Sequence, residues 1–411
     1  MATIRPFRAI RPAKGLEERI AALPYDVYSR EEAKEIVTKN PMSFLKIDRA
    51  ETQFSDLEDI YAPQVYEKAR ETLQAMRQRG EYVQEEKPCF YLYELTMEGR
   101  TQTGIVACAS VDEYEQGIIR KHENTREDKE LDRIRHVDVC NAQTGPIFLA
   151  YRQTEELQKL VLAEKEKPSL YDFTADDQVR HQVWVISDNT VIDRLQQAFK
   201  SVPRVYIADG HHRAASAVAV AKKRRMENPG YTGEEEFNYF LSVFFPDEEL
   251  KILDYNRVVM DLNGNTEEEF LKKLEDSFLV EQALECPYHP DEKGRCGLYL
   301  AGKWYTLQVK AEYVPDDPVE GLDVSILQKQ VLSKILNIQN PKTDSRIQFC
   351  GGIRGLGELE RLVQDKAAAA FSMYPTSIQE LFAVADANLL MPPKSTWFEP
   401  KLRSGLFIHE L

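Results

Sequence analysis

The stretch YIADGHHRAASAVAVAKKRR, residues 206–225, decides how the middle of this 411-residue chain folds. Its first residues are apolar and favour a β-strand, Asp209-Gly210 is a turn signal, and the alanine-rich remainder ends in basic residues, as many helices do. The stretch therefore predicts a strand-to-helix corner. The first backbone N–H groups of such a helix have no partners within it and carry the positive end of its dipole, which favours a bound phosphate or carboxylate.

Polar side chains at this corner would add donors to an anion site. The predicted phosphate ligands among these side chains are His211, His212 and Arg213. Asp209 is the predicted catalytic carboxylate, which would handle a proton, a metal or a hydroxyl. The alternative is structural: Asp209 only caps the helix, and the histidines find partners at its end. No zinc site is expected, because neighbouring helical residues point about 100° apart and neither HExxH nor paired Cys-x-x-Cys is present.

The composition narrows the class of protein. With 43% hydrophobic residues, the chain can form two or three lobes with ample cores. Its net charge of −15 would repel a nucleic acid, whose binding depends on neutralised phosphates. No window reaches the roughly 18 apolar residues of a membrane span, and the first ten residues lack an apolar secretory core. A cytoplasmic protein with neither nucleic-acid nor membrane partners is therefore expected, and its six scattered cysteines are expected to be reduced.

A second charged cluster precedes a helix that is predicted to begin near Thr125. Within this cluster, His122 and Glu123 are predicted catalytic residues, because they lie at the start of the helix and offer groups for proton transfer. Basic residues then recur every three or four positions along one helix face, at Arg126, Lys129, Arg133 and His136. This stripe predicts an anion-facing wall, with Arg126 as a phosphate ligand. A solvated face paired with acidic neighbours is the alternative.

The order of predicted elements indicates an α+β fold with hairpin-rich mixed sheets and packed helices. Residues 89–111 predict a hairpin around Glu98-Gly99, and a second hairpin is predicted around Pro246-Asp247. Strands and helices do not alternate regularly enough for a doubly wound sheet. The lysine-rich segment 153–177 is the expected boundary between an N-terminal lobe, 1–160, and a C-terminal lobe, 161–411. The two lobes are expected to share one cleft.

Two further stretches stand near the C-terminus. In LMPPKSTWFEPKLRSGLFI, residues 390–408, flanking prolines hold Lys394 and Ser395 in a stiff loop, and both are predicted to bind phosphate in the shared cleft. FCGGIRGLGELERLV, residues 349–363, is glycine-rich between a strand and a helix. It lacks the Gly-Lys-Ser/Thr of a P-loop and is a weaker phosphate-loop signal.

Four motifs together resemble a known family. YIADGHHRAASA, KHENTREDKELDR, LPYDVYSREEA and MPPKSTWFEPKLRSGL are similar to a bacterial and archaeal family of unknown function, domain of unknown function 1015, over residues 5 to about 406. The corner also resembles the Gly-x-x-Arg signature of ParB proteins, sulfiredoxins and free-serine kinases. That resemblance implies a ParB/sulfiredoxin-like core at Asp209, with nucleotide phosphates bound by Gly210, His211, His212 and Arg213. Sulfiredoxin chemistry needs a cysteine where His211 stands, so that activity is not expected.

These features predict an enzyme of phosphoryl transfer. Such chemistry requires positive charge around the moving phosphate and a carboxylate that orients the accepting hydroxyl. The expected acceptor is a small hydroxylated metabolite such as serine or phosphoserine, and the expected cofactor is a nucleoside tri- or diphosphate with Mg²⁺. Two alternatives stay open: a phosphatase or phospho-metabolite sensor without nucleotide, and a nucleotide-gated binding protein without turnover. A homodimer is one expected assembly.

Overall fold

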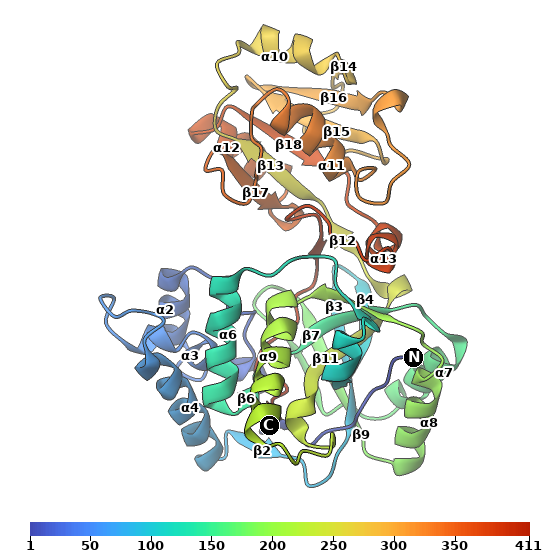
Figure 1. Ribbon diagram of the computed structural model, residues 1–411. Helices are drawn as coiled ribbons and strands as arrows, with labels where there is room; N and C mark the ends of the chain where they lie inside the picture. The colour runs from blue at the N-terminus through green and yellow to red at the C-terminus, as the bar shows by residue number, and fades with distance from the viewer. The chain divides into compact units, whose positions relative to one another are not determined.

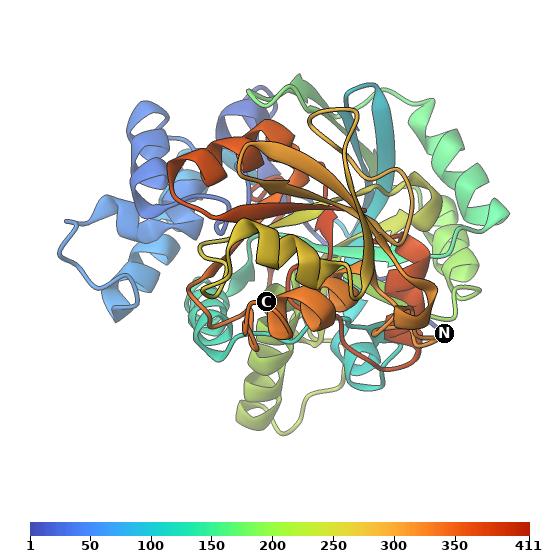
Figure 2. The ribbon, with the colours of Figure 1, turned by 90° about the horizontal axis from the view of Figure 1, so that it is seen from above.

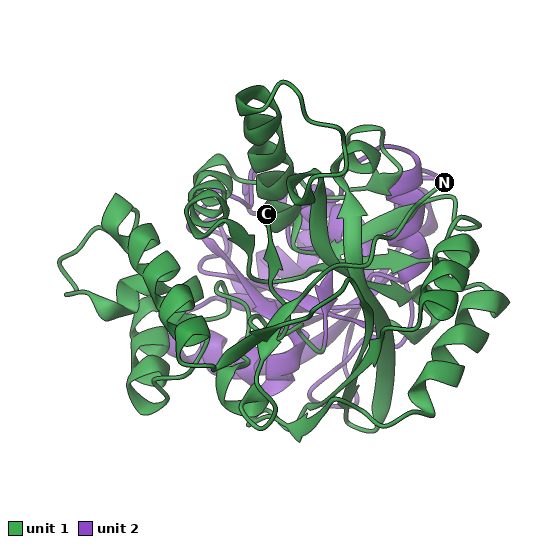
Figure 3. Cartoon of the chain, turned by 90° about the horizontal axis from the view of Figure 1, so that it is seen from below, with its two compact units in different colours: residues 1–250, 400–411 green, residues 251–399 purple.

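The computed structural model describes residues 1–411 and divides into two compact units. The first unit comprises Met1–Leu250 and Pro400–Leu411, and the second comprises Lys251–Glu399 (Figure 3). The boundary expected near residue 160 is not a boundary of these units, because one sheet of the first unit takes strands from both sides of it. The polar segment 153–177 contains helix α7, Glu155–Lys165, and strand β8, Tyr171–Thr174. Its lysines reflect an amphipathic surface helix and not a linker.

The first unit is built on an eight-stranded mixed sheet with the strand order β5-β10-β7-β11-β4-β3-β9-β8 (Figure 1). Its remaining strands are β3 Phe90–Met97, β4 Arg100–Ser110, β5 Ile119–Arg120, β7 Ile147–Tyr151, β9 Arg180–Ile186, β10 Val205–Asp209 and β11 Tyr239–Pro246. The hairpin predicted around Glu98-Gly99 is confirmed as β3–β4. Both turn residues have positive φ, 52° and 76°, which suits the two-residue turn.

Helices of the first unit bury two hydrophobic clusters. Helices α7, α8 (Asn189–Phe199) and α9 (His211–Glu227) share one cluster with the sheet, through Leu157, Leu195 and Ala217. The other cluster contains side chains of α3 (Leu45–Asp48), α4 (Pro63–Gln78) and α6 (Glu127–Cys140). Figure 1 shows α6 lying between α4 and α9, and it contacts both. The shorter elements are β1 Ile10–Pro12, α1 Glu17–Ile20, α2 Arg30–Lys39, η1 Ala50–Gln53, β2 Tyr82–Gln84, α5 Val111–Glu115, η2 Glu236–Asn238 and η3 Asp247–Glu249.

The predicted strand-to-helix corner is confirmed as β10–Gly210–α9. Gly210 has φ 92°, a backbone conformation that residues with a Cβ rarely adopt, and α9 continues for 17 residues. By contrast, the hairpin predicted around Pro246-Asp247 is wrong. Strand β11 pairs with β4 and β7, whereas the next strands, β12 (Ile252–Leu253) and β13 (Tyr255–Val259), belong to the second unit.

The C-terminal segment is part of the core of the first unit. Ser404 bridges Ala22, and strand β20 (His409–Glu410) pairs with β6 (Ala142–Gln143). The side chains of the apolar residues before β20 are fully buried, with 0% exposure at Leu406, Phe407 and Ile408. A truncation before this segment would therefore remove core residues as well as the loop that precedes it.

The second unit contains a six-stranded antiparallel sheet with the order β14-β16-β15-β18-β13-β17, coloured from yellow to red in Figures 1 and 2. Its elements are α10 Glu267–Leu274, β14 Phe278–Gln282, β15 Arg295–Leu300, β16 Lys303–Val309, η4 Ala311–Tyr313, α11 Asp323–Leu327, the π-helical η5 Gln328–Ser333, β17 Ile347–Gly351, η6 Gly352–Arg354, α12 Leu356–Asp365, β18 Ala369–Met373, α13 Ile378–Asp386 and β19 Trp397–Phe398. Helix α12 ends at Asp365, and the last of the alanines that follow it belong to β18. None of the helices in the chain combines the length and apolar composition that crossing a membrane requires.

Candidate functional site

Asp209 ends strand β10 and is fixed by two donors. The Gly210 N–H donates to Oδ1 at 2.9 Å, and the Lys401 ammonium donates to Oδ2 at 3.2 Å. Burial opposes ionisation of this carboxyl, but the charges of Lys401 and Arg213 outweigh it and hold the pKa of Asp209 well below its usual range. The carboxylate is therefore ionised at neutral pH. Lys401 belongs to the C-terminal motif but was not among the residues predicted from it.

The segment before α6 meets the start of α9 through two histidines. The rings of His122 and His211 pack edge to face, with centroids 4.6 Å apart, and their exposed fractions are 1% and 8%. Burial lowers the pKa of His122 to about 4, although a hydrogen bond with the Ile207 backbone and the charge of Asp209 act in the other direction. Burial and the neighbouring His122 also lower the pKa of His211. Both rings are therefore neutral at pH 7.

The ring nitrogens of the two corner histidines have different surroundings. Nε2 of His211 is buried and makes no hydrogen bond, which is rare for a polar atom in a protein interior. Nε2 of His212 accepts a hydrogen bond of 3.0 Å from the backbone N–H of Arg126. That contact joins the start of α6 to the start of α9. His211 therefore has unused hydrogen-bonding capacity at this corner, on a nitrogen that can donate or accept according to its tautomer.

Arg213 lines a small internal cavity beside the corner. Its Nη1 donates to the carbonyl of Pro146 at 2.6 Å. The cavity measures about 30 Å³, and its polar lining residues are Tyr25, Asp48, Arg133, His136, Gln143, Thr144, Arg213, Ser216 and Ser404. Asp48 accepts a hydrogen bond of 2.8 Å from the Thr144 hydroxyl. The space suits ordered water and is far smaller than a typical pocket for an organic ligand.

The basic stripe of α6 does not form one wall. The Arg126 side chain is 66% exposed and pairs with Asp128, whereas Arg133 and His136 are only 7% and 3% exposed. The Arg133 guanidinium lies 4.1 Å from the ring centre of Tyr25 and pairs with Asp132. Burial raises the pKa of Tyr25 to about 12, even though Arg133 opposes that shift. The prediction of one anion-facing stripe is therefore wrong: its far half lies inside the protein, beside the cavity.

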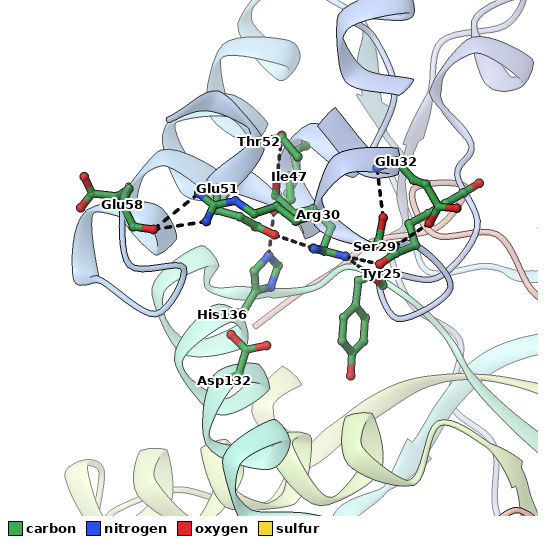
Figure 4. A network of polar contacts seen from close by, with 12 residues as sticks. Tyr25, Ser29, Arg30, Glu32, Ile47, Glu51, Thr52, Glu58, Asp132 and His136 are labelled. Atoms are coloured by element: carbon green, nitrogen blue, oxygen red, sulfur yellow. Dashed lines mark hydrogen bonds and ion pairs between the residues drawn. The ribbon is translucent and has the colours of Figure 1, made fainter. Parts of the chain in front are cut away.

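Figure 4 shows how the N-terminal motif LPYDVYSREEA packs beside this part of α6. Nε2 of His136 lies 3.1 Å from the Ile47 carbonyl, and Ser29 and Glu32 form a capping box at the start of α2. The carbonyl of Tyr25 is held by Arg49, whose Nη1 donates to it at 2.9 Å. These contacts fix Tyr25 at the cavity. The sequence around Tyr25 consists of charged and turn-forming residues and did not indicate that position.

The other predicted site residues lie as follows. Glu123 is half-buried on the segment between β5 and α6. Lys394 and Ser395 belong to the second unit, where the Lys394 ammonium lies 5.6 Å from the ring centre of Tyr255. The Ser395 hydroxyl donates to the Pro392 carbonyl at 2.7 Å. Their predicted role in phosphate binding stays a prediction, as do the catalytic roles of His122 and Glu123.

The glycine-rich loop of residues 349–363 has a packing explanation. A Cβ at Gly351 would lie 2.9 Å from the Trp397 ring, and a Cβ at Gly352 would lie 2.1 Å from Asp254 Oδ1. Both positions therefore need glycine for close packing, whether or not a phosphate binds. No group of three or more His, Cys, Asp or Glu side chains in residues 1–411 is arranged to hold a metal ion.

The fold and site define an α+β protein with a charged, histidine-rich corner between a strand and a long helix. The family model described as "Protein of unknown function (DUF1015)" matches residues 4–325, so the chain belongs to this family. No curated protein matches it.

Among solved structures, this chain is similar to a free serine kinase in complex with AMP, at 15% identity and a TM-score of 0.37 over 74% of this chain and 91% of that one. A conserved hypothetical protein from Pyrococcus furiosus matches at 14% identity and a TM-score of 0.35, covering 74% and 94%. SbnI with a C-terminal truncation, from Staphylococcus aureus, matches at 11% identity and a TM-score of 0.39, covering 74% and 86%.

Proposed function

We propose that this protein is an enzyme that transfers a phosphoryl group from a nucleotide to a hydroxyl of a small metabolite, with serine among the acceptors to be tested. The observation that carries the proposal is the set of groups at the start of α9. An ionised carboxylate, Asp209, lies beside two cations, Lys401 and Arg213, and beside a buried imidazole with an unused nitrogen, His211. Phosphoryl transfer requires this combination of positive charge and one oriented carboxylate.

The phosphate side of the reaction would use backbone and side-chain donors together. The first N–H groups of α9 and the positive end of its dipole favour an anion, and the positive φ of Gly210 lets the backbone turn sharply into the helix. Arg213 and Lys401 would neutralise charge on the phosphate, and Nε2 of His211 would supply or accept a further hydrogen bond. His212 would contribute its backbone N–H to this shell. The Gly210 N–H already donates to Asp209, so Gly210 would contribute through the sharp turn that it allows.

Asp209 would be the carboxylate that orients the hydroxyl of the acceptor. Its lowered pKa keeps the carboxylate ionised, so that it can accept a hydrogen bond from the hydroxyl that attacks phosphorus. The new bond joins that hydroxyl oxygen to the phosphorus, the bond from phosphorus to the nucleotide breaks, and the hydroxyl proton passes to Asp209 or to water. One carboxylate beside nucleotide phosphates also fits Mg²⁺, which would supply charge neutralisation when bound. Glu123 is the second carboxylate that would take this role.

A direct assay tests the proposal. The purified protein is incubated with ATP or ADP, Mg²⁺ and a panel of hydroxy amino acids and sugars, and the products are followed by phosphorus NMR. We expect one acceptor to gain a phosphoryl group, and Asp209→Asn to slow the reaction at least about a hundredfold. The matched control is Asp193→Asn, an exposed carboxylate on α8, which should react at the rate of the unaltered protein.

Two results would overturn the proposal in favour of the alternatives. Nucleotide binding without any phospho-product or free phosphate would favour a nucleotide-gated binding protein. Release of phosphate from phospho-metabolites without nucleotide would favour a phosphatase. The cytoplasm is the compartment we propose for the enzyme, because all six cysteines are free, as is usual where thiols are kept reduced.

A further inference from the structure

The second unit contains a groove that the proposed function does not use. It lies between the end of the β15–β16 hairpin and the start of α11 and has a volume of about 440 Å³. Small-molecule pockets commonly fall between about 300 and 1,000 Å³. Its lining residues are Lys293, Gly294, Gln308, Val309, Ala311, Val314 and Asp323. A much smaller cavity of about 10 Å³ shares Gly294, Val309 and Asp323 with it and is otherwise lined mainly by buried apolar side chains.

The carboxylate of Asp323 lies where the groove and the small cavity meet. Its two oxygens accept hydrogen bonds from one donor, the Gly294 N–H, at 3.1 and 3.0 Å. A carboxylate has about four acceptor positions, so most of its capacity is unused. No lysine, arginine or histidine forms an ion pair with it. Burial raises the pKa of Asp323 to about 6, opposed by the Gly294 N–H, while Glu380 raises it further and Lys293 lowers it.

The other polar groups of the groove are already bonded. The Lys293 ammonium pairs with Glu380 at 2.6 Å. Gln308 uses both ends of its amide: Oε1 accepts from Arg295 at 2.7 Å, and Nε2 donates to the Gly294 carbonyl at 3.2 Å. The charged groups around Asp323 are therefore engaged with one another and not with its carboxylate.

The remaining wall of the groove is apolar. Val309 is 7% exposed and forms the inner part, whereas Val314 is 43% exposed at the outer part. A ligand that fits this surface needs a cationic donor for the carboxylate and a short hydrocarbon body for the valines. An ammonium would offset the cost of burying the carboxylate, and each buried CH₂ would add affinity.

We propose that this groove binds a small organic ammonium ion, with its charged nitrogen on Asp323 and its hydrocarbon part on Val309 and Val314. Every residue in this proposal belongs to the second unit, and none belongs to the corner at Asp209. The groove and the phosphoryl-transfer proposal can therefore fail independently.

Saturation-transfer difference NMR on the full-length protein tests the groove, because it detects weak ligands of large proteins. The probe is n-butylammonium, with butyrate as the probe of opposite charge. We expect the butylammonium methyl group to receive saturation and butyrate to receive none. Lengthening the chain from propyl to pentyl should improve Kd about three- to fourfold for each added methylene. Binding should also strengthen as the pH rises from about 5 to 7.5, because the site requires the ionised carboxylate.

Two variants with matched controls decide the outcome. Asp323→Asn should weaken butylammonium binding at least about tenfold, whereas Asp291→Asn, an exposed carboxylate of the neighbouring loop, should not change it. If Asp323→Asn does not fold, Val314→Lys places a like charge at the accessible end of the groove and should have the same effect, with the fully exposed Leu284→Lys as its control. Unchanged binding in a folded Asp323→Asn or in Val314→Lys, or equal binding of butyrate, would overturn the proposal.

Discussion

His211 and His181 are both buried histidines of the first unit, but the surroundings of their ring nitrogens differ. His181 is 0% exposed; its Nδ1 lies 2.8 Å from the Tyr93 hydroxyl, and its Nε2 accepts from Arg403 at 3.3 Å. His211 is 8% exposed, and its Nε2 has no partner. A buried histidine with both nitrogens bonded is explained by the fold alone, whereas one with an unused nitrogen beside charged groups is a candidate for binding.

The balance of positive and negative charge around the two histidines also differs. Arg403 pairs with Asp177, so the His181 cluster contains its own counter-charge. At the corner, Asp209 faces Lys401 and Arg213, and this leaves an excess of positive charge beside His211. His181 therefore belongs to a closed structural network, whereas we propose that the network around His211 binds an anion. Four predictions test this difference.

The largest effect is expected from matched substitutions of the two histidines. His181→Leu should lower the free energy of unfolding by about 4 kcal/mol, because Arg403 Nε would stay buried without its partner and the Tyr93 hydroxyl would keep only its long contact of 3.5 Å with the Arg403 N–H. His211→Leu should cost less than about 1 kcal/mol, because Nε2 has no hydrogen bond to lose. Urea unfolding of both variants measures the difference. Similar losses would remove the distinction between the two sites.

The next effect is acid sensitivity of the corner. An unfolded histidine titrates near 6.5, whereas folded His122 has a pKa of about 4. Between pH 6.5 and about 4, His122 therefore binds a proton in the unfolded chain but not in the folded chain. Stability is lost as the pH falls from about 6.5 to 4, by about 3 kcal/mol from this residue. His122→Gln should flatten the fall in urea-derived stability over this range. An unchanged slope in that variant would show that His122 is not the group responsible.

The sequence predicted the corner well because every signal there is local. The apolar strand, Asp209-Gly210 and the alanine-rich helix each specify their own backbone without distant partners. The hairpin at Glu98-Gly99 was predicted for the same reason. At Pro246-Asp247, a turn signal of the same kind gave a wrong prediction of a hairpin. Strand β11 pairs with strands that are distant in sequence, and the residues from Lys251 onward belong to the second unit.

The missed site residues depend on contacts that are distant in sequence. Lys401 reaches Asp209 across 192 residues, and nothing near Lys401 indicates that pairing. The prolines around Lys394 made it the more noticeable lysine of the same motif. Asp48 belongs to a four-residue helix without any charged pattern, and it became visible only as a wall of the cavity. The helical spacing that suggested a basic stripe was correct, but spacing does not show which part of a helix face is covered.

A smaller effect is expected at Arg213, where a substitution tests whether the corner, unlike the closed network around His181, binds phosphate. Arg213→Ala should weaken ATP binding by about 2 kcal/mol, roughly thirtyfold, because it removes a charge-assisted contact to phosphate. Lys222→Ala, an exposed residue on the same helix, is the control and should bind ATP normally. Titration calorimetry measures both. If Arg213→Ala folds and its Kd for ATP matches that of the control, the corner is not the phosphate site.

The smallest effect is expected at Lys394, which extends the comparison to the loop of the second unit. This lysine is exposed, has φ 60°, and holds its ammonium near the Tyr255 ring, so a phosphate would gain a solvent-exposed partner. Exposed ion pairs contribute little, and Lys394→Met should therefore weaken ATP binding only about threefold, roughly 0.6 kcal/mol. Lys342→Met, another exposed lysine of this unit, is the control. Because such a contact is screened by salt, the threefold loss should shrink when the ionic strength is raised to about 1 M. A loss that persists at high salt would indicate a change in the loop, and no loss at low salt would remove Lys394 from the phosphate ligands.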